Sequence, residues 1–150
     1  SQFTLGDYYY GQKDYERATE SYTTFLEQYP DERLARENKK LRKKATMLLG
    51  HLSEIDAYNI YAEGEKLFDK KDYPEAIKIF RDVQEKYPTS EQSVNAAVNI
   101  GAAFMALEDY RKAADEFQRV VEAYTGNSRF TLQVDFSNQQ LKQLEEARLL

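Results

Sequence analysis

The sequence predicts an all-α fold in which antiparallel helix pairs stack as a repeat array. One set of residues recurs at fixed displacements along the 150-residue chain, and apolar residues between these positions recur at helical spacing. The three prolines all lie where this pattern places a helix end or a first turn. With 41% apolar and 31% charged residues, the chain has the composition of a globular protein, and its length suits one domain.

Three copies of one motif establish the repeat. The segment GDYYYGQKDYERATESYTTFLEQYP, which begins at Gly6, matches GEKLFDKKDYPEAIKIFRDVQEKYP, which begins at Gly64, and a third copy begins at Gly101. The displacements are therefore 58 and then 37 residues. The other shared positions are Asp14, Asp72 and Asp109; Ala18, Ala76 and Ala113; Tyr22, Phe80 and Phe117; and Tyr29, Tyr87 and Tyr124. We interpret each copy as one helix-turn-helix unit.

Each shared position has a physical role in such a unit. The glycine on the first helix and the alanine on the second allow the two backbones to approach closely, and the aromatic residue fills the space beside them. The aspartates are placed to cap the second helix, and Asp72 with Glu75 has the spacing of a capping box. Pro30 and Pro88 are expected to end the second helices of their units.

These residues resemble the tetratricopeptide repeat family. The 37-residue spacing and the Tyr-Pro endings are similar to repeats of bacterial cell-envelope proteins, such as outer-membrane assembly lipoproteins and Tol-Pal-associated proteins. The resemblance implies a right-handed superhelical solenoid. The expected organisation of residues 1–150 is repeat 1 at 1–30, an inserted helix at 31–52, repeat 2 at 54–88, repeat 3 at 89–125 and a terminal capping helix at 128–149.

The inserted segment carries one apolar stripe at alternating spacings of four and three residues. Its members are Leu34, Asn38, Leu41, Ala45, Leu48, Leu52 and Ile55. We expect a helix that ends near Gly50, followed by a new helix that Ser53 and Asp56 cap, in preference to one unbroken helix. The stripe is expected to pack on the neighbouring repeat, and the alternative is a short coiled coil with a second chain.

The same segment holds a basic cluster. Residues 33–44 carry a net charge of +6, so the rest of the chain sums to −11. We favour a solvated face or pairing with the acidic repeats. The alternative is a patch for an anionic partner, formed by Arg36, Lys39, Lys40, Lys43 and Lys44. No aromatic residues interleave with these cations, which argues against nucleic acid.

The segment from Arg129 to Phe136 alternates polar and apolar residues as a strand would. Phe130 and Val134 are also a helical pair, and the pattern continues through Leu141 and Leu144. Because an isolated strand would leave its backbone groups without partners, we predict a helix.

Catalytic chemistry finds no support in the sequence. There is no cysteine, His51 is the only histidine, and Gly-rich phosphate loops and nucleophile elbows are absent. We therefore expect no enzyme activity, metal, cofactor or small-molecule substrate. No apolar run is long enough to span a bilayer, so any membrane contact would be peripheral. The chain begins at Ser1 without an initiator methionine and is expected to be a processed product or an excised piece.

The family geometry implies a concave trough lined by the first helix of each unit. The predicted trough residues are Phe3, Asp7, Tyr10, Tyr58, Tyr61, Glu65, Phe68, Asn95, Val98, Asn99, Ala102 and Met105. We expect a non-catalytic scaffold that binds a peptide or helix of a partner protein in this trough, in a bacterial cell envelope or periplasm rather than the cytoplasm. The alternative is a self-assembly module that forms a homo-oligomer through the helix at 34–55 or through open repeat ends.

Overall fold

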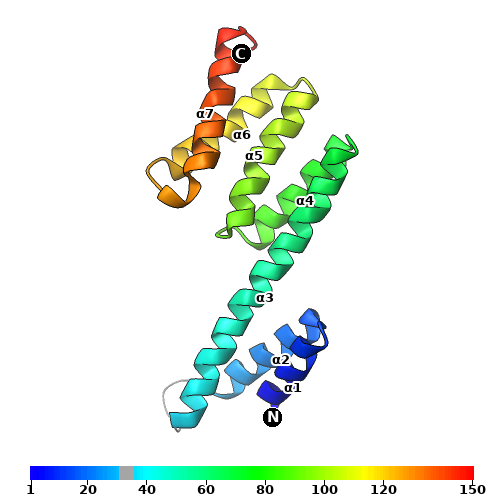
Figure 1. Ribbon diagram of the computed structural model, residues 1–150, viewed down its shortest axis with the longest axis vertical. Coiled ribbons are helices and arrows are strands. Elements are labelled where there is room, and N and C mark those ends of the chain that lie inside the picture. The colour runs from blue at the N-terminus through cyan, green and yellow to red at the C-terminus, as the bar shows by residue number, and fades with distance from the viewer. Residues whose placement is uncertain (31–35) are drawn as a thin grey trace. The chain divides into compact units, whose positions relative to one another are not determined.

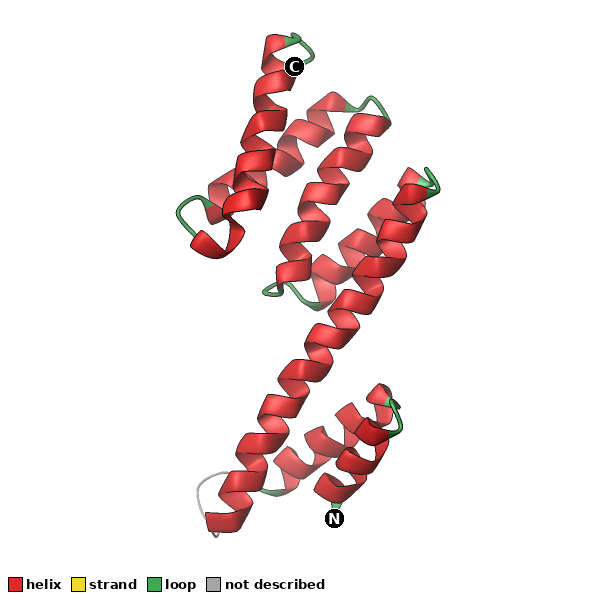
Figure 2. Cartoon of the chain, in the orientation of Figure 1, coloured by secondary structure: helices red, strands yellow, loops and turns green. Residues whose placement is uncertain are grey.

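The computed structural model describes residues 1–30 and 36–150, which form seven α-helices and one short 3₁₀ turn (Figures 1 and 2). The predicted all-α helical-repeat fold is thereby confirmed. The elements are α1 (Gln2–Gly11), α2 (Tyr15–Gln28), α3 (Arg36–Asp69), α4 (Tyr73–Lys86), α5 (Glu91–Ala106), α6 (Tyr110–Tyr124), η2 (Ser128–Phe130) and α7 (Thr131–Glu146). The chain packs as two compact units, Ser1–Asp56 and Ala57–Leu150.

Unit 1 is built from α1, α2 and the first part of α3. Its core contains Phe3 and Phe25, whose ring centroids lie 5.4 Å apart, together with Ala45 and Leu52 from α3. Arg42 of α3 donates hydrogen bonds to the backbone carbonyls of Leu26, at 2.8 Å, and Tyr29, at 3.0 Å. These carbonyls lie at the C-terminal end of α2, where the helix cannot satisfy them itself. The arginine therefore fastens α3 to the end of α2.

The apolar stripe of α3 is used within the chain, as we expected. Leu41, Ala45, Leu48 and Leu52 all pack against the core of unit 1. Leu34, the first member of the stripe, lies outside the described residues. Because this face is already covered by α1 and α2, a coiled coil with a second chain through the same stripe would require unit 1 to unpack.

The predicted helix break near Gly50 is wrong, because α3 runs unbroken from Arg36 to Asp69. Ser53 does not cap a new helix, and its hydroxyl instead donates to the Leu49 carbonyl at 3.0 Å, one turn earlier. Gly50 is exposed, with no atom near the position its Cβ would occupy. A glycine in a helix interior costs only about 1 kcal/mol, and the buried stripe on the opposite face outweighs that cost.

Unit 2 consists of the end of α3, then α4, α5, α6 and α7, which follow one another as packed neighbours (Figure 1). Its core cluster joins Phe80 and Val83 of α4 to Ala96 and Ile100 of α5. The terminal segment is helical, as predicted, because η2 leads directly into α7. Phe130 is buried there and its ring lies 5.0 Å from that of Tyr124.

The predicted close approach of helices within each repeat is confirmed. A Cβ atom placed on Gly6 would lie 2.5 Å from the ring of Tyr22, and one on Gly64 would lie 2.5 Å from the ring of Phe80. The third repeat has the same contact between Gly101 and Phe117, at 2.6 Å. The buried aromatic ring of the second helix thus occupies the space that a side chain on the first helix would need.

The turns between paired helices repeat as closely as the helices. Lys13, Lys71 and Glu108 occupy equivalent positions and all adopt a left-handed backbone, with φ of 59°, 64° and 59°. The aspartate that follows begins the second helix, and Asp14 and Asp109 accept hydrogen bonds from backbone amides as predicted. Asp72 makes no such bond, and Glu75 pairs with Lys78 at 3.0 Å, so the predicted capping box is not formed.

Candidate partner-binding surface

The structure divides the predicted trough residues between the two units and gives them different degrees of exposure. Asp7, Tyr58 and Glu65 are exposed, and Phe3 is buried at 6% exposure. The half-buried members are Tyr10, Tyr61, Phe68, Asn95, Val98, Asn99, Ala102 and Met105. The assignment of Phe3 to the trough is therefore corrected: its ring packs against Tyr22 and Phe25 in the core of unit 1, where no partner can contact it.

In unit 2, two side-chain hydrogen bonds connect predicted trough residues of α3 and α5 with each other and with α7. The Asn99 amide of α5 donates to the Tyr61 hydroxyl of α3 at 2.7 Å. On the same helix α5, Asn95 accepts from the Gln133 amide of α7 at 2.9 Å. All four side chains are half-buried, so one edge of each stays open to solvent. The first helices of successive repeats thus bring their polar residues to one surface, which we call the amide ladder.

Gln133 is a member of this ladder that the sequence analysis missed. The terminal segment was expected only to cover the end of the stack, and its helical pattern indicated Phe130 and Val134 but not Gln133, which precedes Val134. The pairing of Gln133 with Asn95 depends on how α7 packs beside α5, which no local pattern of the sequence records.

Tyr61 is the aromatic centre of the ladder. Its ring lies 5.5 Å from that of Phe80, which is fully buried. Burial of the side chain, followed by the negative charge of Glu65, raises the pKa of Tyr61 to about 12, and the hydrogen bond from Asn99 offsets part of this rise. The hydroxyl therefore stays protonated at neutral pH and can donate a hydrogen bond while it accepts the one from Asn99.

Exposed groups surround the ladder. Tyr58 is 55% exposed and lies one turn before Tyr61 on α3, and Glu65 is exposed one turn after it. Val98 and Met105 contribute half-buried apolar surface on α5. The surface therefore combines aromatic, apolar, amide and acidic groups, which suits recognition of an amphipathic segment of a protein.

The trough residues of unit 1 are engaged in contacts of their own. The Tyr22 hydroxyl donates to the Asp7 carboxylate at 2.6 Å, and burial together with that carboxylate raises the pKa of Tyr22. Tyr10 is half-buried with its ring 5.9 Å from that of Tyr15. Both contacts are made between α1 and α2, so these side chains stabilise the first repeat.

The basic residues predicted as an anionic-partner patch are all exposed on the first turns of α3. They are Arg36, Lys39, Lys40, Lys43 and Lys44, and Arg33 of the same cluster lies outside the described residues. The ammonium group of Lys44 lies 5.7 Å from the centre of the Phe3 ring. Lys39 and Lys43 line a shallow depression with Met47, which is 55% exposed.

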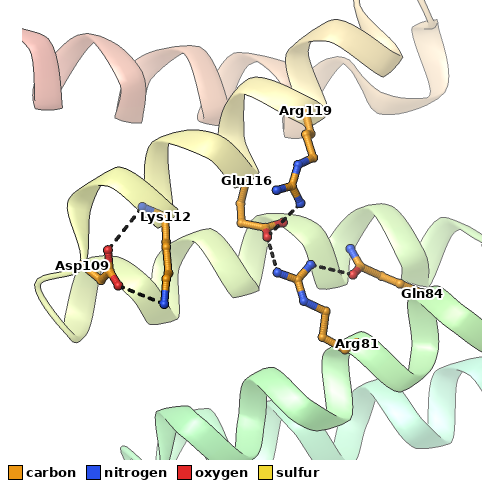
Figure 3. Close-up of polar contacts among 6 residues, drawn as sticks. All are labelled: Arg81, Gln84, Asp109, Lys112, Glu116 and Arg119. Atoms are coloured by element: carbon orange, nitrogen blue, oxygen red, sulfur yellow. Dashed lines mark hydrogen bonds and ion pairs between the residues drawn. The ribbon is translucent and has the colours of Figure 1, made fainter. Parts of the chain in front are cut away.

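A buried carboxylate links repeat 2 to repeat 3. Glu116 of α6 is 3% exposed, and its Oε1 atom accepts hydrogen bonds from Arg81 of α4 and from Arg119, the latter at 3.1 Å (Figure 3). Arg81 also donates to Gln84 at 3.1 Å. Arg119 binds the carboxylate within α6, whereas Arg81 reaches it from α4, so the contact of Arg81 with Glu116 holds the second helices of the two repeats together.

Within residues 1–30 and 36–150, no group of three or more His, Asp or Glu side chains is placed to hold a metal ion. His51 is exposed on α3. Among the described helices, none combines the length and the apolar character that crossing a bilayer requires.

The repeated glycine–aromatic contacts and capped turns define a tetratricopeptide repeat protein, and comparison with known families agrees. Residues 1–32 match the model of a tetratricopeptide repeat family. Residues 53–134 match the model of YfiO, described as an outer membrane lipoprotein. Since this second match covers more than half of the chain, the protein belongs to the YfiO outer membrane lipoprotein family. No curated protein matches the chain.

The environment of Tyr61 predicts a loss of stability at high pH. In the unfolded chain this tyrosine ionises near its ordinary pKa of 10.0, whereas in the folded chain it holds its proton to about pH 12. The stability that it contributes is therefore complete below pH 10 and is lost as the pH rises towards 12. Urea unfolding at pH 9 and pH 11 should show a smaller loss for Tyr61→Phe than for the native chain. Tyr58→Phe, on an exposed ring of the same helix, is the control, and equal losses in all three proteins would contradict the prediction.

Proposed function

We propose that this protein is a non-catalytic interaction scaffold of the bacterial cell envelope, and that it binds a helix or extended peptide of a partner protein on the amide-ladder surface of unit 2. Membership of the YfiO family supports a protein-interaction scaffold in the envelope. We choose this surface because of one observation, the amide ladder. It joins trough residues of α3 and α5 to Gln133 of α7, and all four side chains are only half-buried.

The chemistry of the surface specifies the kind of partner. Tyr58 offers an exposed ring, and Val98 and Met105 offer apolar contacts, so the partner needs at least one apolar anchor. Glu65 is the acidic group beside Tyr61, and a basic residue next to the anchor would complement it. The half-open amides of Asn95 and Asn99 can hydrogen-bond a backbone or a polar side chain.

Removal of exposed groups tests this surface without disturbing the core. We expect the double variant Tyr58→Ala with Glu65→Ala to recover its envelope partners at least about tenfold less well than the native chain, because one aromatic anchor and one charge contribute more than about 1.4 kcal/mol. The measurement is quantitative capture from a bacterial envelope extract, with thermal unfolding to check that each protein is folded.

A matched control lies on α6. Asp115 and Gln118 are exposed there, and Asp115→Ala with Gln118→Ala should leave partner recovery unchanged. If the Tyr58 and Glu65 variant recovers the same partners as this control, the amide-ladder surface is not the binding site.

The alternative function, self-assembly through the stripe at 34–55, receives less support. Four members of the stripe are already engaged within unit 1, since Ala45 and Leu52 lie in its core and Leu41 and Leu48 pack against that core. An association of this chain with itself would need a different surface.

A further inference from the structure

A second surface of unit 2 stands apart from the amide ladder. An open depression of about 670 Å³ lies between the end of α3 and α4. Its lining combines the half-buried Ile60 and Ile79 with exposed polar residues, namely Asn59, Glu63, Asp82, Glu85 and one cation, Lys86. We call the two isoleucines and the three carboxylates, which outnumber the lysine, the acidic end face.

Comparison of equivalent positions in repeats 2 and 3 shows what covers the corresponding surface in repeat 3. At a displacement of 37 residues, the counterparts of Asn59, Glu63 and Ile79 in repeat 3 are Ala96, Ile100 and Glu116. All three counterparts are buried. Ala96 and Ile100 lie in the core with Phe80 and Val83 of α4, and Glu116 is bound by Arg81 of α4. In repeat 3 this side of the unit is therefore covered by a helix of the preceding repeat.

In repeat 2 the same side has a different chemistry. Alanine and isoleucine are replaced by the exposed Asn59 and Glu63, while Ile79 takes the place of the buried glutamate. Asp82 stands where repeat 3 has Arg119, so the charge at that position is reversed. A helix that covers this face must therefore bring an apolar side chain to Ile60 and Ile79, and cations to Glu63, Asp82 and Glu85.

The chain itself carries a helix face of this composition. Arg36, Lys39, Lys43 and Met47 recur at helical spacing along α3, on the side opposite the buried stripe, and all four are exposed. We call them the basic stripe. Among the described residues, none forms an ion pair with a member of the stripe, and Met47 is 55% exposed. Its three cations and one flexible apolar side chain match what the acidic end face requires.

We propose that the acidic end face is a self-association site, which takes the basic stripe of a second copy of this chain. Met47 of one copy lies over Ile60 and Ile79 of the other, and Lys39 and Lys43 pair with Asp82 and Glu85. Exposed ion pairs are individually weak, so the contact is of modest affinity and depends on salt. It uses neither the amide ladder nor the buried stripe, and association therefore leaves the proposed partner surface unoccupied.

A charge-swap experiment tests the pairing. The first variant, Lys39→Glu with Lys43→Glu, makes both surfaces acidic, and the second, Asp82→Lys with Glu85→Lys, makes both basic. We expect the native chain to associate in sedimentation-velocity experiments at low salt and to dissociate at 10 times that ionic strength. Each variant alone should associate at least about tenfold more weakly than the native chain, because like charges meet at the contact.

An equimolar mixture of the two variants should associate again, since every contact between unlike copies then joins opposite charges. The formal net charges are −9 for the first variant and −1 for the second, calculated from −5 for the native chain. Because both are negative, net-charge attraction cannot produce the complex. A control with the same charge change as the second variant, Asp115→Lys with Glu122→Lys on exposed positions of α6, should associate as the native chain does.

Three outcomes would overturn the proposal. The native chain could stay monomeric at several hundred micromolar in low salt, the two variants could associate as tightly as the native chain, or their mixture could fail to associate. Circular dichroism of each variant confirms that the exposed substitutions leave the helices folded. A failure here would leave the amide-ladder proposal intact, because the envelope capture depends on Tyr58 and Glu65.

Discussion

The variant Arg81→Ala is expected to lower the free energy of unfolding by about 3 kcal/mol, the larger of the two main effects that we predict on stability. Its guanidinium group is one of two cations that bind Glu116, whose side chain is only 4% exposed. Without Arg81, the buried carboxylate keeps Arg119 alone, and Arg119 is itself 64% exposed. The loss reflects the penalty of a poorly compensated buried charge, and equilibrium urea unfolding measures it.

Two further variants separate this penalty from a loss of packing. In Arg81→Met with Glu116→Leu, the charges are replaced by apolar groups of similar size, and most of the stability should return. Lys78→Ala removes a cation from α4, the helix that also carries Arg81. Because Lys78 and its partner Glu75 are both exposed, this change should lower the free energy of unfolding by less than about 0.5 kcal/mol. If Arg81→Ala costs no more than Lys78→Ala, the buried cluster does not hold repeats 2 and 3 together.

The variant Gly64→Ala is expected to destabilise the protein by about 2 kcal/mol. The added methyl group would lie 2.5 Å from a ring carbon of Phe80, and that ring is fully buried and cannot move aside. Overpacking of this kind costs about 1 to 3 kcal/mol and outweighs the gain of up to about 1 kcal/mol in helix propensity. Chemical denaturation of the purified chain gives the value.

Gly50→Ala provides a matched control on the same helix. Apart from the adjoining residues and backbone of α3 itself, nothing lies within 4 Å of the Cβ position at Gly50, so this change should stabilise the protein by about 0.5 to 1 kcal/mol through helix propensity alone. Combining Gly64→Ala with Phe80→Leu should cost less than the sum of the two single changes, because leucine frees space for the methyl group. Effects of the same sign at Gly50 and Gly64 would contradict the packing argument.

The two predictions concern two different kinds of helix contact. Gly64 and Phe80 control the approach of helices within one repeat, whereas Arg81 and Glu116 control the contact between neighbouring repeats. Neither pair includes a residue of the amide ladder or of the acidic end face. Stability and binding can therefore be tested on separate sets of side chains.

Local patterns in the sequence were sufficient for the helix-turn-helix units. The glycine, aspartate and aromatic positions of the three repeats were all found from their spacing, because each acts within its own unit at short sequence separation. The basic cluster and the apolar stripe of α3 were found in the same way, since a helix places residues three and four apart on one face.

The break near Gly50 was predicted wrongly because local signals competed with packing. Gly50, Ser53 and Asp56 resemble a helix end and a new cap, but the apolar residues from Leu41 to Leu52 pack as one face on the core of unit 1. Burial of several apolar side chains contributes more than a cap residue can. Phe3 was wrongly assigned to the trough because the side that it faces depends on the rotation of α1 against α2, which is set by packing and not by a local pattern.

The sequence by itself determined that this protein is a helical repeat of the tetratricopeptide class, because repeated residues at fixed displacements carry that information locally. Only the tertiary structure decided which of those residues remain accessible. The pairing of Tyr61 with Asn99, of Asn95 with Gln133 and of Arg81 with Glu116 joins positions 35 to 38 residues apart. Such contacts depend on the angle and register at which neighbouring helices pack, which are set by the summed packing of whole faces and not by any single motif.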